Sequence, residues 1–210
     1  MLQLSAPAIV CAARVHGETG VIVRVLTEEH GMLAGYVAGG RGRNLRPVLV
    51  PGNLVQAEFF ARSDNQLPSI RPELLESRGP WLNEPLPAAA IGWSTALTAA
   101  VLAERQPFPA LWSGLAALLA AICHAPSARG WAAALVRYEA LMLRELGYGT
   151  AVSLPDSDDF PAILGAMDRL GVEIARHALA DRRTDVMGAR AILRQRLDRI
   201  AGSGQETGTT

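Results

Sequence analysis

Residues 9–26, with the sequence IVCAARVHGETGVIVRVL, decide the fold of the N-terminal part of the chain. Two apolar runs flank the polar segment HGETG at residues 16–20, and β-branched residues dominate the second run. In the first run, apolar residues alternate with smaller or polar ones, at Ile9, Cys11, Ala13 and Val15. Runs of this kind on both sides of a glycine-containing turn predict a β-hairpin.

Three more strands are expected downstream of this hairpin, separated by turn residues. A second turn is expected at residues 28–31, and the strands at residues 32–38, 53–61 and 67–75. Together with the hairpin, they predict five short antiparallel strands. Such strands suit a small closed barrel, because closure removes the exposed edges that a flat sheet would leave.

The pattern becomes helical after Pro80, Pro85 and Pro87. Periodicity and capping residues predict five helices, at residues 88–104, at 108–124, from Ser127 to Gly147, from Asp159 to about residue 180, and after Thr184 or Asp185. The sequence therefore predicts an α+β protein. Its domains are expected to be a five-stranded β-barrel at residues 1–79, an all-α domain at residues 80–202, and a disordered polar tail at residues 203–210.

Positive charge is concentrated in the segment GGRGRNLR at residues 39–46, between the third and fourth expected strands. Arg41, Arg43 and Arg46 give residues 32–57 a charge of +3 without any Asp or Glu, although the whole chain has 20 basic and 20 acidic residues. Guanidinium groups and glycine N–H groups bind phosphate, which indicates a nucleic-acid contact. Composition alone equally allows a solvated loop that carries charge for solubility.

Two further sets of residues on the expected strands are candidates for the same surface. Arg14 and Arg24 could add phosphate contacts from the barrel, because one face of such barrels commonly binds single-stranded nucleic acid. Tyr36, Phe59 and Phe60 could stack on bases, although core packing is the better assignment for at least two of these three.

No motif for catalysis, for a cofactor or for a metal is present. The chain contains no GxSxG, no P-loop and no GxGxxG that opens a helix, so we expect a protein that is not an enzyme and needs no cofactor. Its two cysteines, Cys11 and Cys123, stand far apart, and its four histidines lack metal-ligand spacing. The acidic cluster at residues 156–159 fits helix capping better than cation binding.

The N-terminus has no charged region ahead of a long apolar run, so we expect no signal peptide and a cytoplasmic location. Residues 86–103 are uncharged, but they contain Pro87 and several small polar residues, which favours a buried helix over a membrane span. We therefore expect no membrane association.

A second group of arginines lies near the C-terminus. Residues 182–199 contain six arginines and two aspartates, a local charge of +4. Their stems could cover the apolar stripe of the last helix while their heads reach solvent. Alternatively, they could form a second basic surface for DNA or for an acidic partner.

The order of these features resembles the RecO family of bacterial recombination mediators. The segments that carry the resemblance are HGET at residues 16–19, EHG at 29–31, GGRGR at 39–43, PGNLV at 51–55, GW at 130–131, RYE at 137–139 and LGYG at 146–149. The resemblance implies an OB-fold barrel followed by an α-helical domain, without catalytic residues. It also implies binding of single- and double-stranded DNA, strand annealing, and loading of RecA together with RecR and the single-strand-binding protein. An apolar groove of the helical domain would hold the acidic C-terminal tail of that last protein.

The chain departs from this family after residue 149. Many members have a zinc-finger-like insertion there, whereas this sequence runs through residues 150–159 directly toward the next helix. We therefore expect no metal. The missing insertion and the zero net charge also support a rival interpretation, a partner-binding scaffold with weak DNA affinity. An RNA-binding OB module is a third alternative.

Overall fold

The computed structural model describes residues 2–61, 63, 66–149, 152–155, 159–180 and 186–203. The chain forms two compact units, Met1–Asn83 with Thr95–Ser113, and Glu84–Ser94 with Gly114–Thr210. Each unit is described separately below. The domain ranges 1–79 and 80–202 remain predictions, and most of the expected tail lies outside the described residues.

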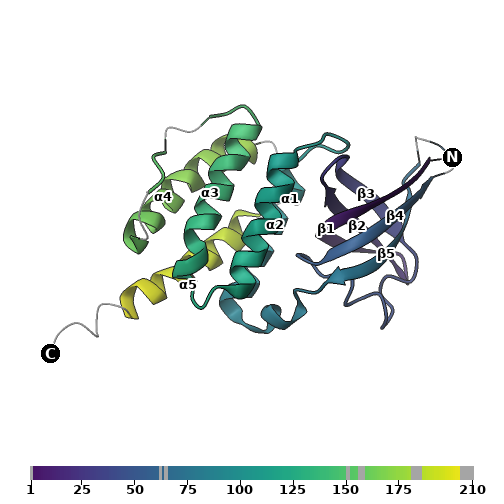
Figure 1. Ribbon diagram of the computed structural model, residues 1–210, viewed down its shortest axis with the longest axis horizontal. Helices are drawn as coiled ribbons and strands as arrows, with labels where there is room; N and C mark the ends of the chain where they lie inside the picture. Colours follow the sequence, from purple (N-terminus) through teal and green to yellow (C-terminus); the bar gives the residue numbers. More distant parts are fainter. Residues whose placement is uncertain are drawn as a thin grey trace. The chain divides into compact units, whose positions relative to one another are not determined.

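The N-terminal unit contains a closed five-stranded barrel with the strand order β1-β2-β3-β5-β4 (Figure 1). Its strands are β1 (Leu2–His16), β2 (Gly20–Thr27), β3 (Gly31–Val37), β4 (Leu54–Ala61) and β5 (Ser69–Glu76). The longest strand, β1, pairs with β2 along its second half and with β4 along its first half, and thereby closes the barrel. The predicted α+β class and the OB-type barrel are confirmed.

Two details of the barrel differ from the sequence-based expectation. The strands are not all antiparallel, because β3 and β5 run parallel where Tyr36 pairs with Ser69. The barrel needs this pairing to close, since β4 lies on the far side of β5 from β3. The first strand also begins at Leu2, well before Ile9, because its first half is needed as the partner of β4.

A β-bulge in β1 changes which side chains face the barrel interior. Period-two alternation would place Ile9, Cys11, Ala13 and Val15 on one face, but the register with β2 shifts between Val10 and Ala12. As a result Val10 pairs with Val25 before the bulge, and Ala13 pairs with Val23 after it. Before the bulge the even-numbered residues of β1 share a face with the core valines of β2, and after it the odd-numbered ones do.

The barrel core is aliphatic with one aromatic ring. It contains Ala8, Val10, Val21, Val23, Val25, Val37, Leu49, Val55, Ala57, Phe59 and Ile70. All but one of these residues come from strands, and the exception is Leu49, which lies in the β3–β4 connection. The barrel interior therefore anchors that connection.

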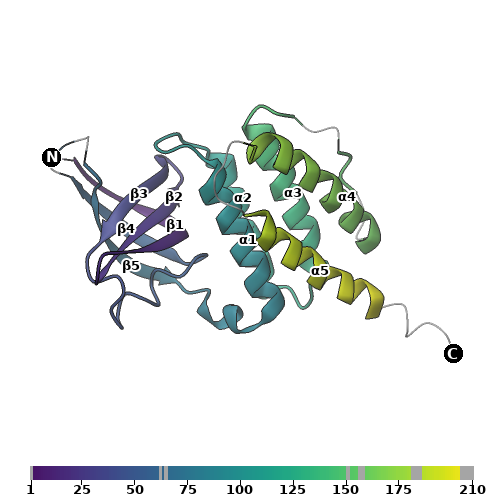
Figure 2. The same ribbon diagram turned by 180° about the vertical axis from the view of Figure 1, so that it is seen from behind.

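The remaining elements are helical (Figure 2). They are η1 (Gly79–Asn83), α1 (Pro85–Val101), α2 (Pro109–His124), α3 (Arg129–Glu145), α4 (Phe160–Glu173), the π-helical turn η2 (Ile174–Ala178) and α5 (Met187–Ser203). All five predicted helices are present. The first begins three residues earlier than expected, because proline fits the first turn of a helix. Ser127 is not the N-cap of α3, since Ala128 takes that position.

The second unit packs around large buried side chains. Trp93 of α1, Trp131 of α3 and Phe160 of α4 are each at most 2% exposed. Apolar residues at three- and four-residue intervals form a buried stripe on α3, at Trp131, Leu135, Tyr138 and Met142. Helix α4 begins after Asp159, as expected from its sequence.

Candidate nucleic-acid interface

The connection between β3 and β4, residues 38–53, carries the three clustered arginines and is called the arginine loop here. Its apolar residues follow a helical spacing, with Leu45, Val48 and Leu49 packed into or against the barrel core. The N–H groups of Val48 and Leu49 both donate to the carbonyl of Leu45, at 3.0 and 3.1 Å. This turn directs the apolar side chains inward, and Arg41, Arg43 and Arg46 are exposed.

Two glycines allow the arginine loop to turn away from the end of β3 while it stays packed against the barrel. Gly39 has a φ of +65°, a left-handed conformation that other residues adopt with strain. At Gly40, a Cβ atom would lie 2.9 Å from the Cβ of Val21 and 3.0 Å from a methyl carbon of Leu49. Gly39 and Gly40 are therefore required by the backbone conformation and the packing of the loop, whether or not their N–H groups also contact a ligand.

Asn53 fixes the other end of the arginine loop. This side chain is fully buried, and its Nδ2 donates to the carbonyls of Pro47 and Val48, at 2.9 and 3.1 Å. Its Oδ1 accepts a 2.7 Å hydrogen bond from the N–H of Arg78. A single amide thus satisfies three backbone groups of two segments. In the sequence Asn53 stands out only as part of the PGNLV segment, which does not reveal this function.

The three arginines differ in how firmly they are held. The Nη1 of Arg41 donates to the carbonyl of Glu18 at 2.7 Å, and its backbone N–H donates to the carbonyl of Thr19 at 3.1 Å. These two hydrogen bonds hold the arginine loop against the β1–β2 turn. Arg43 and Arg46 are exposed and form no ion pair within the described part of the chain. Their guanidinium groups are available to an anionic ligand.

A groove opens at the mouth of the barrel beside the arginine loop, and it is called the mouth groove here. It has a volume of about 470 Å³. Its lining consists of Ala13, Val15, Val21, Gly40, Arg41, Arg46, Leu49, Val50 and Pro51. The structure therefore brings two of the predicted arginines together on one apolar depression.

The two arginines predicted on the strands have different surroundings. Arg14 is exposed on β1, between Ala13 and Val15, and alternation turns it away from the mouth groove. Arg24 is half-buried, its Nη2 donates to the carbonyl of Leu102 at 3.1 Å, and the same atom lies 3.9 Å from a carboxylate oxygen of Glu104. Arg24 is thus engaged by the segment that follows α1.

The three aromatic residues that could stack on bases differ in burial and in their contacts. Phe59 is 1% exposed in the barrel core, so it cannot stack on a base. Phe60 is half-buried, with the guanidinium carbon of Arg71 5.0 Å from its ring centre. Tyr36 is half-buried and meets His16 edge to face, with 6.1 Å between the ring centres.

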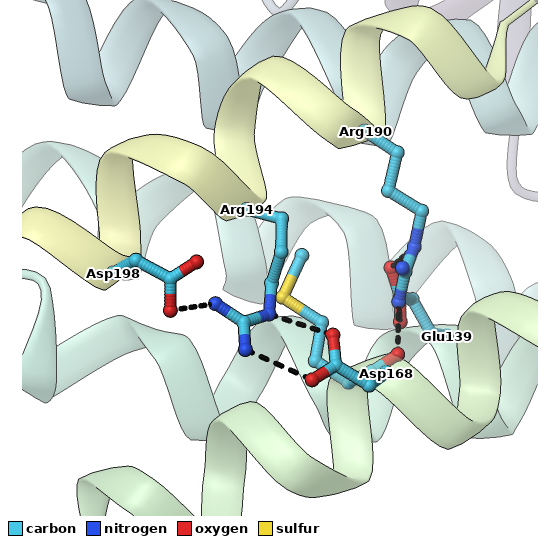
Figure 3. A network of polar contacts seen from close by, with 6 residues as sticks. Glu139, Asp168, Arg190, Arg194 and Asp198 are labelled. Atoms are coloured by element: carbon cyan, nitrogen blue, oxygen red, sulfur yellow. Dashed lines mark hydrogen bonds and ion pairs between the residues drawn. The ribbon is translucent and has the colours of Figure 1, made fainter.

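Two of the described C-terminal arginines, Arg190 and Arg194, form ion pairs with neighbouring helices (Figure 3). Arg190 is buried and binds Glu139, while Arg194 donates to both carboxylate oxygens of Asp168, at 2.7 and 2.9 Å, and also pairs with Asp198. The hydrogen bond with Asp168 is the main cause of a raised pKa for Arg194, and that with Asp198 adds to it. The expectation that all these heads reach solvent is wrong for Arg190, whose partner Glu139 the sequence did not reveal.

Few other features indicate a site. Within the described residues, no group of three or more His, Cys, Asp or Glu side chains could hold a metal ion. Most of the acidic cluster at residues 156–159 lies outside the described residues, and Asp159 takes the N-cap position of α4. None of the helices in the described ranges is long and apolar enough to cross a membrane.

Comparison with protein families matches the two parts of the chain separately. Residues 1–78 match the family described as recombination protein O N terminal. Residues 85–153 match the family described as recombination protein O C terminal. The two matches lie in the same order as the barrel and the helices.

Curated relatives give the same result. The DNA repair protein RecO of Phenylobacterium zucineum is 40% identical over 153 residues, which cover 72% of this chain and 62% of the relative. That of Rhodospirillum rubrum is 42% identical over 156 residues, or 73% of this chain and 62% of the relative. That of Caulobacter vibrioides is 35% identical over 179 residues, or 84% of this chain and 70% of the relative. The chain spans less than two thirds of the length of the first two relatives. Since both halves match in order and at this identity, the chain belongs to the RecO family.

Proposed function

We propose that this protein is a non-enzymatic DNA-binding mediator of recombinational repair. It would bind single- and double-stranded DNA, anneal complementary strands, and help load RecA onto DNA that the single-strand-binding protein covers, together with RecR. The observation that carries the proposal is the display of Arg41, Arg43 and Arg46 on a loop whose apolar side is anchored in the barrel core. The names of the relatives support a role in DNA repair.

The proposed contact is with the DNA backbone. Arg41, Arg43 and Arg46 would neutralise phosphates, and exposed Arg14 would extend the contact along β1. Arg24 would make no phosphate contact while Leu102 and Glu104 engage it. Such contacts are independent of sequence, which suits a protein that must act on any damaged region.

Fluorescence anisotropy titrations on single-stranded DNA at several salt concentrations test this proposal. If all three arginines of the loop touch phosphate, changing them together to alanine should lower the log–log salt slope by about 2, at roughly 0.7 per contact. A matched control changes three exposed arginines of the helices, Arg137, Arg169 and Arg199, to alanine, which removes the same charge. Equal losses in both triple variants would mean that total charge, and not the arginine loop, controls binding.

An annealing assay then separates the proposed mediator from its rivals. The mediator should accelerate the pairing of complementary strands, and the loop variant should lose most of that acceleration. A scaffold would bind DNA too weakly to anneal it. An RNA-binding module would prefer RNA over DNA of the same sequence, which a parallel titration with RNA measures.

A further inference from the structure

The mouth groove exists because β4 stops short of the end of β1. The β1–β4 register ends where Ile9 pairs with Leu54, whereas β1 continues to His16 and pairs over residues 12–16 with β2 alone among the described strands. Over residues 12–16, one edge and the inner face of β1 therefore lack a covering strand. At Val10 the edge is still paired, because its N–H donates to the carbonyl of Asn53 at 2.9 Å and its carbonyl accepts from the N–H of Gly52 at 2.8 Å.

Val15 shows that an interior face of the barrel is open at this point. It pairs with Val21 and lies on the face that carries the core valines, yet it is 66% exposed. Single exposed apolar residues are ordinary, but this one continues a buried face and lines a groove together with Leu49, Val50 and Pro51. The volume of the groove, about 470 Å³, falls in the range of small-ligand sites, which occur in the mouths of β-barrels.

The chemistry of the groove combines an apolar floor with a cationic rim. Arg41 and Arg46 line it, and the loop that supplies them has no carboxylate from residue 32 to residue 57. Glu18 binds Arg41 through its backbone carbonyl, and its side chain does not line the groove. A fitting ligand has a flat apolar body next to negative charges, as an unstacked nucleotide has.

We infer that the mouth groove seats one unstacked base of a single DNA strand while Arg41 and Arg46 bind the flanking phosphates. This inference rests on the proposed function and adds a preference for single strands. In a duplex the bases are paired and stacked inside the helix, so only phosphates would reach the arginine loop. The contact differs from aromatic stacking because the groove offers aliphatic side chains.

Strands with and without bases test this inference directly. A thymidine oligonucleotide and an abasic strand of the same length carry the same phosphates, so their affinity ratio isolates the bases. We expect wild type to prefer the thymidine strand about fivefold, because a seated base would bury apolar surface in the groove. Val15→Ser should bring this ratio close to one without changing the salt slope.

A matched control variant is Leu75→Ser. Leu75 is 52% exposed on β5 and does not line the mouth groove, so its change removes a similar apolar surface from the same barrel. The ratio should stay at the wild-type value. Because Val15 and Leu75 are both exposed, both variants should fold, and their melting curves should match that of wild type.

An optical probe of the base gives a second readout. A strand with one 2-aminopurine should become more fluorescent on binding wild type, because the probe leaves its stacked neighbours, and this rise should be lost in Val15→Ser. Equal affinity of wild type for both strands, without a fluorescence rise, would overturn the inference. The groove would then be a site for another ligand, such as an acidic peptide. Different results would contradict the proposed function: no binding of either strand by wild type, or an unchanged salt slope when Arg41, Arg43 and Arg46 are all changed to alanine.

Discussion

Arg190 of α5 donates two hydrogen bonds to Glu139 of α3, from Nε to Oε1 at 3.0 Å and from Nη2 to Oε2 at 2.8 Å. Glu139 has no exposed surface, and its Oε1 also accepts a 2.8 Å hydrogen bond from the indole N–H of Trp93. Arg190 donates in addition to the carbonyl of Met167 in α4. One buried ion pair therefore joins α1, α3, α4 and α5.

Glu139→Gln should strongly destabilise the protein. The change leaves the guanidinium of Arg190 buried without its counter-charge, and loss of one partner of a buried pair costs about 3–5 kcal/mol. Urea unfolding followed by circular dichroism measures the loss. Arg137→Gln, an exposed change on the same helix, should stay within about 0.5 kcal/mol of wild type.

A double variant checks the origin of that loss. In Glu139→Gln/Arg190→Met the uncompensated charge is gone, so the double variant should be more stable than the sum of the two single losses predicts. Additive losses would show that the two residues act independently, contrary to the hydrogen bonds between them.

Asn53→Ala should loosen the arginine loop. It leaves the N–H of Arg78 and the carbonyls of Pro47 and Val48 without this partner, and each unsatisfied buried group costs about 1–3 kcal/mol. We expect a total loss of at least ~2 kcal/mol and faster hydrogen exchange at Val48 and Leu49. Mass spectrometry of exchanged peptides measures the second effect.

Asn44→Ala is the matched control for this prediction. Asn44 is exposed in the same loop, so its change should alter neither stability nor exchange. If Asn53→Ala also left the exchange at Val48 and Leu49 unchanged, the barrel core alone would hold the loop.

The sequence predicted the parts of the fold that depend on neighbours along the chain. Glycine turns and apolar runs identified the five strands, and helical periodicity identified the five helices. The bulge after Val10 was not predictable, because it follows from pairing with β2 and not from the pattern of β1 itself. The parallel pairing of β3 with β5 likewise results from barrel closure.

The same limit applies to the candidate site. The charge of Arg41, Arg43 and Arg46 is visible in the sequence, but one of the three hydrogen bonds of Asn53 joins it to Arg78, 25 residues away. The partner of Arg190 lies 51 residues away. A polar residue whose partner is remote in sequence cannot be told from a solvated one by composition or spacing.

Cys11 should make the stability of the protein fall at high pH. Burial raises the pKa of its thiol from 9.0 to about 12, against smaller lowering effects of the Leu26 backbone and Arg24. The folded state therefore keeps a proton that the unfolded state releases. This contribution is fully present below pH 9 and is lost as the pH rises toward 12, at up to ~1.4 kcal/mol per pH unit.

Urea unfolding of wild type and Cys11→Ala between pH 8 and pH 11 isolates this effect, since all other groups titrate in both proteins. The variant should be less stable at pH 8, because it leaves a small cavity, and its stability relative to wild type should rise by about 2.6 kcal/mol by pH 11. Parallel stability curves would show that the thiol ionises equally in both states.

Arg14 and Arg24 have the same charge on adjacent strands, and the structure predicts opposite consequences for their loss. Arg14 is exposed, so Arg14→Ala should leave the free energy of unfolding unchanged and lower the salt slope of DNA binding by about 0.7, the value of one phosphate contact. Arg24 donates to the carbonyl of Leu102, so Arg24→Ala should cost about 1–2 kcal/mol of stability and leave the salt slope as it is. Anisotropy titrations and urea unfolding of both variants measure the four quantities. If Arg24→Ala lowered the slope as Arg14→Ala does, Arg24 would have to leave Leu102 when DNA binds, and the DNA surface would extend along β2 beyond the arginine loop.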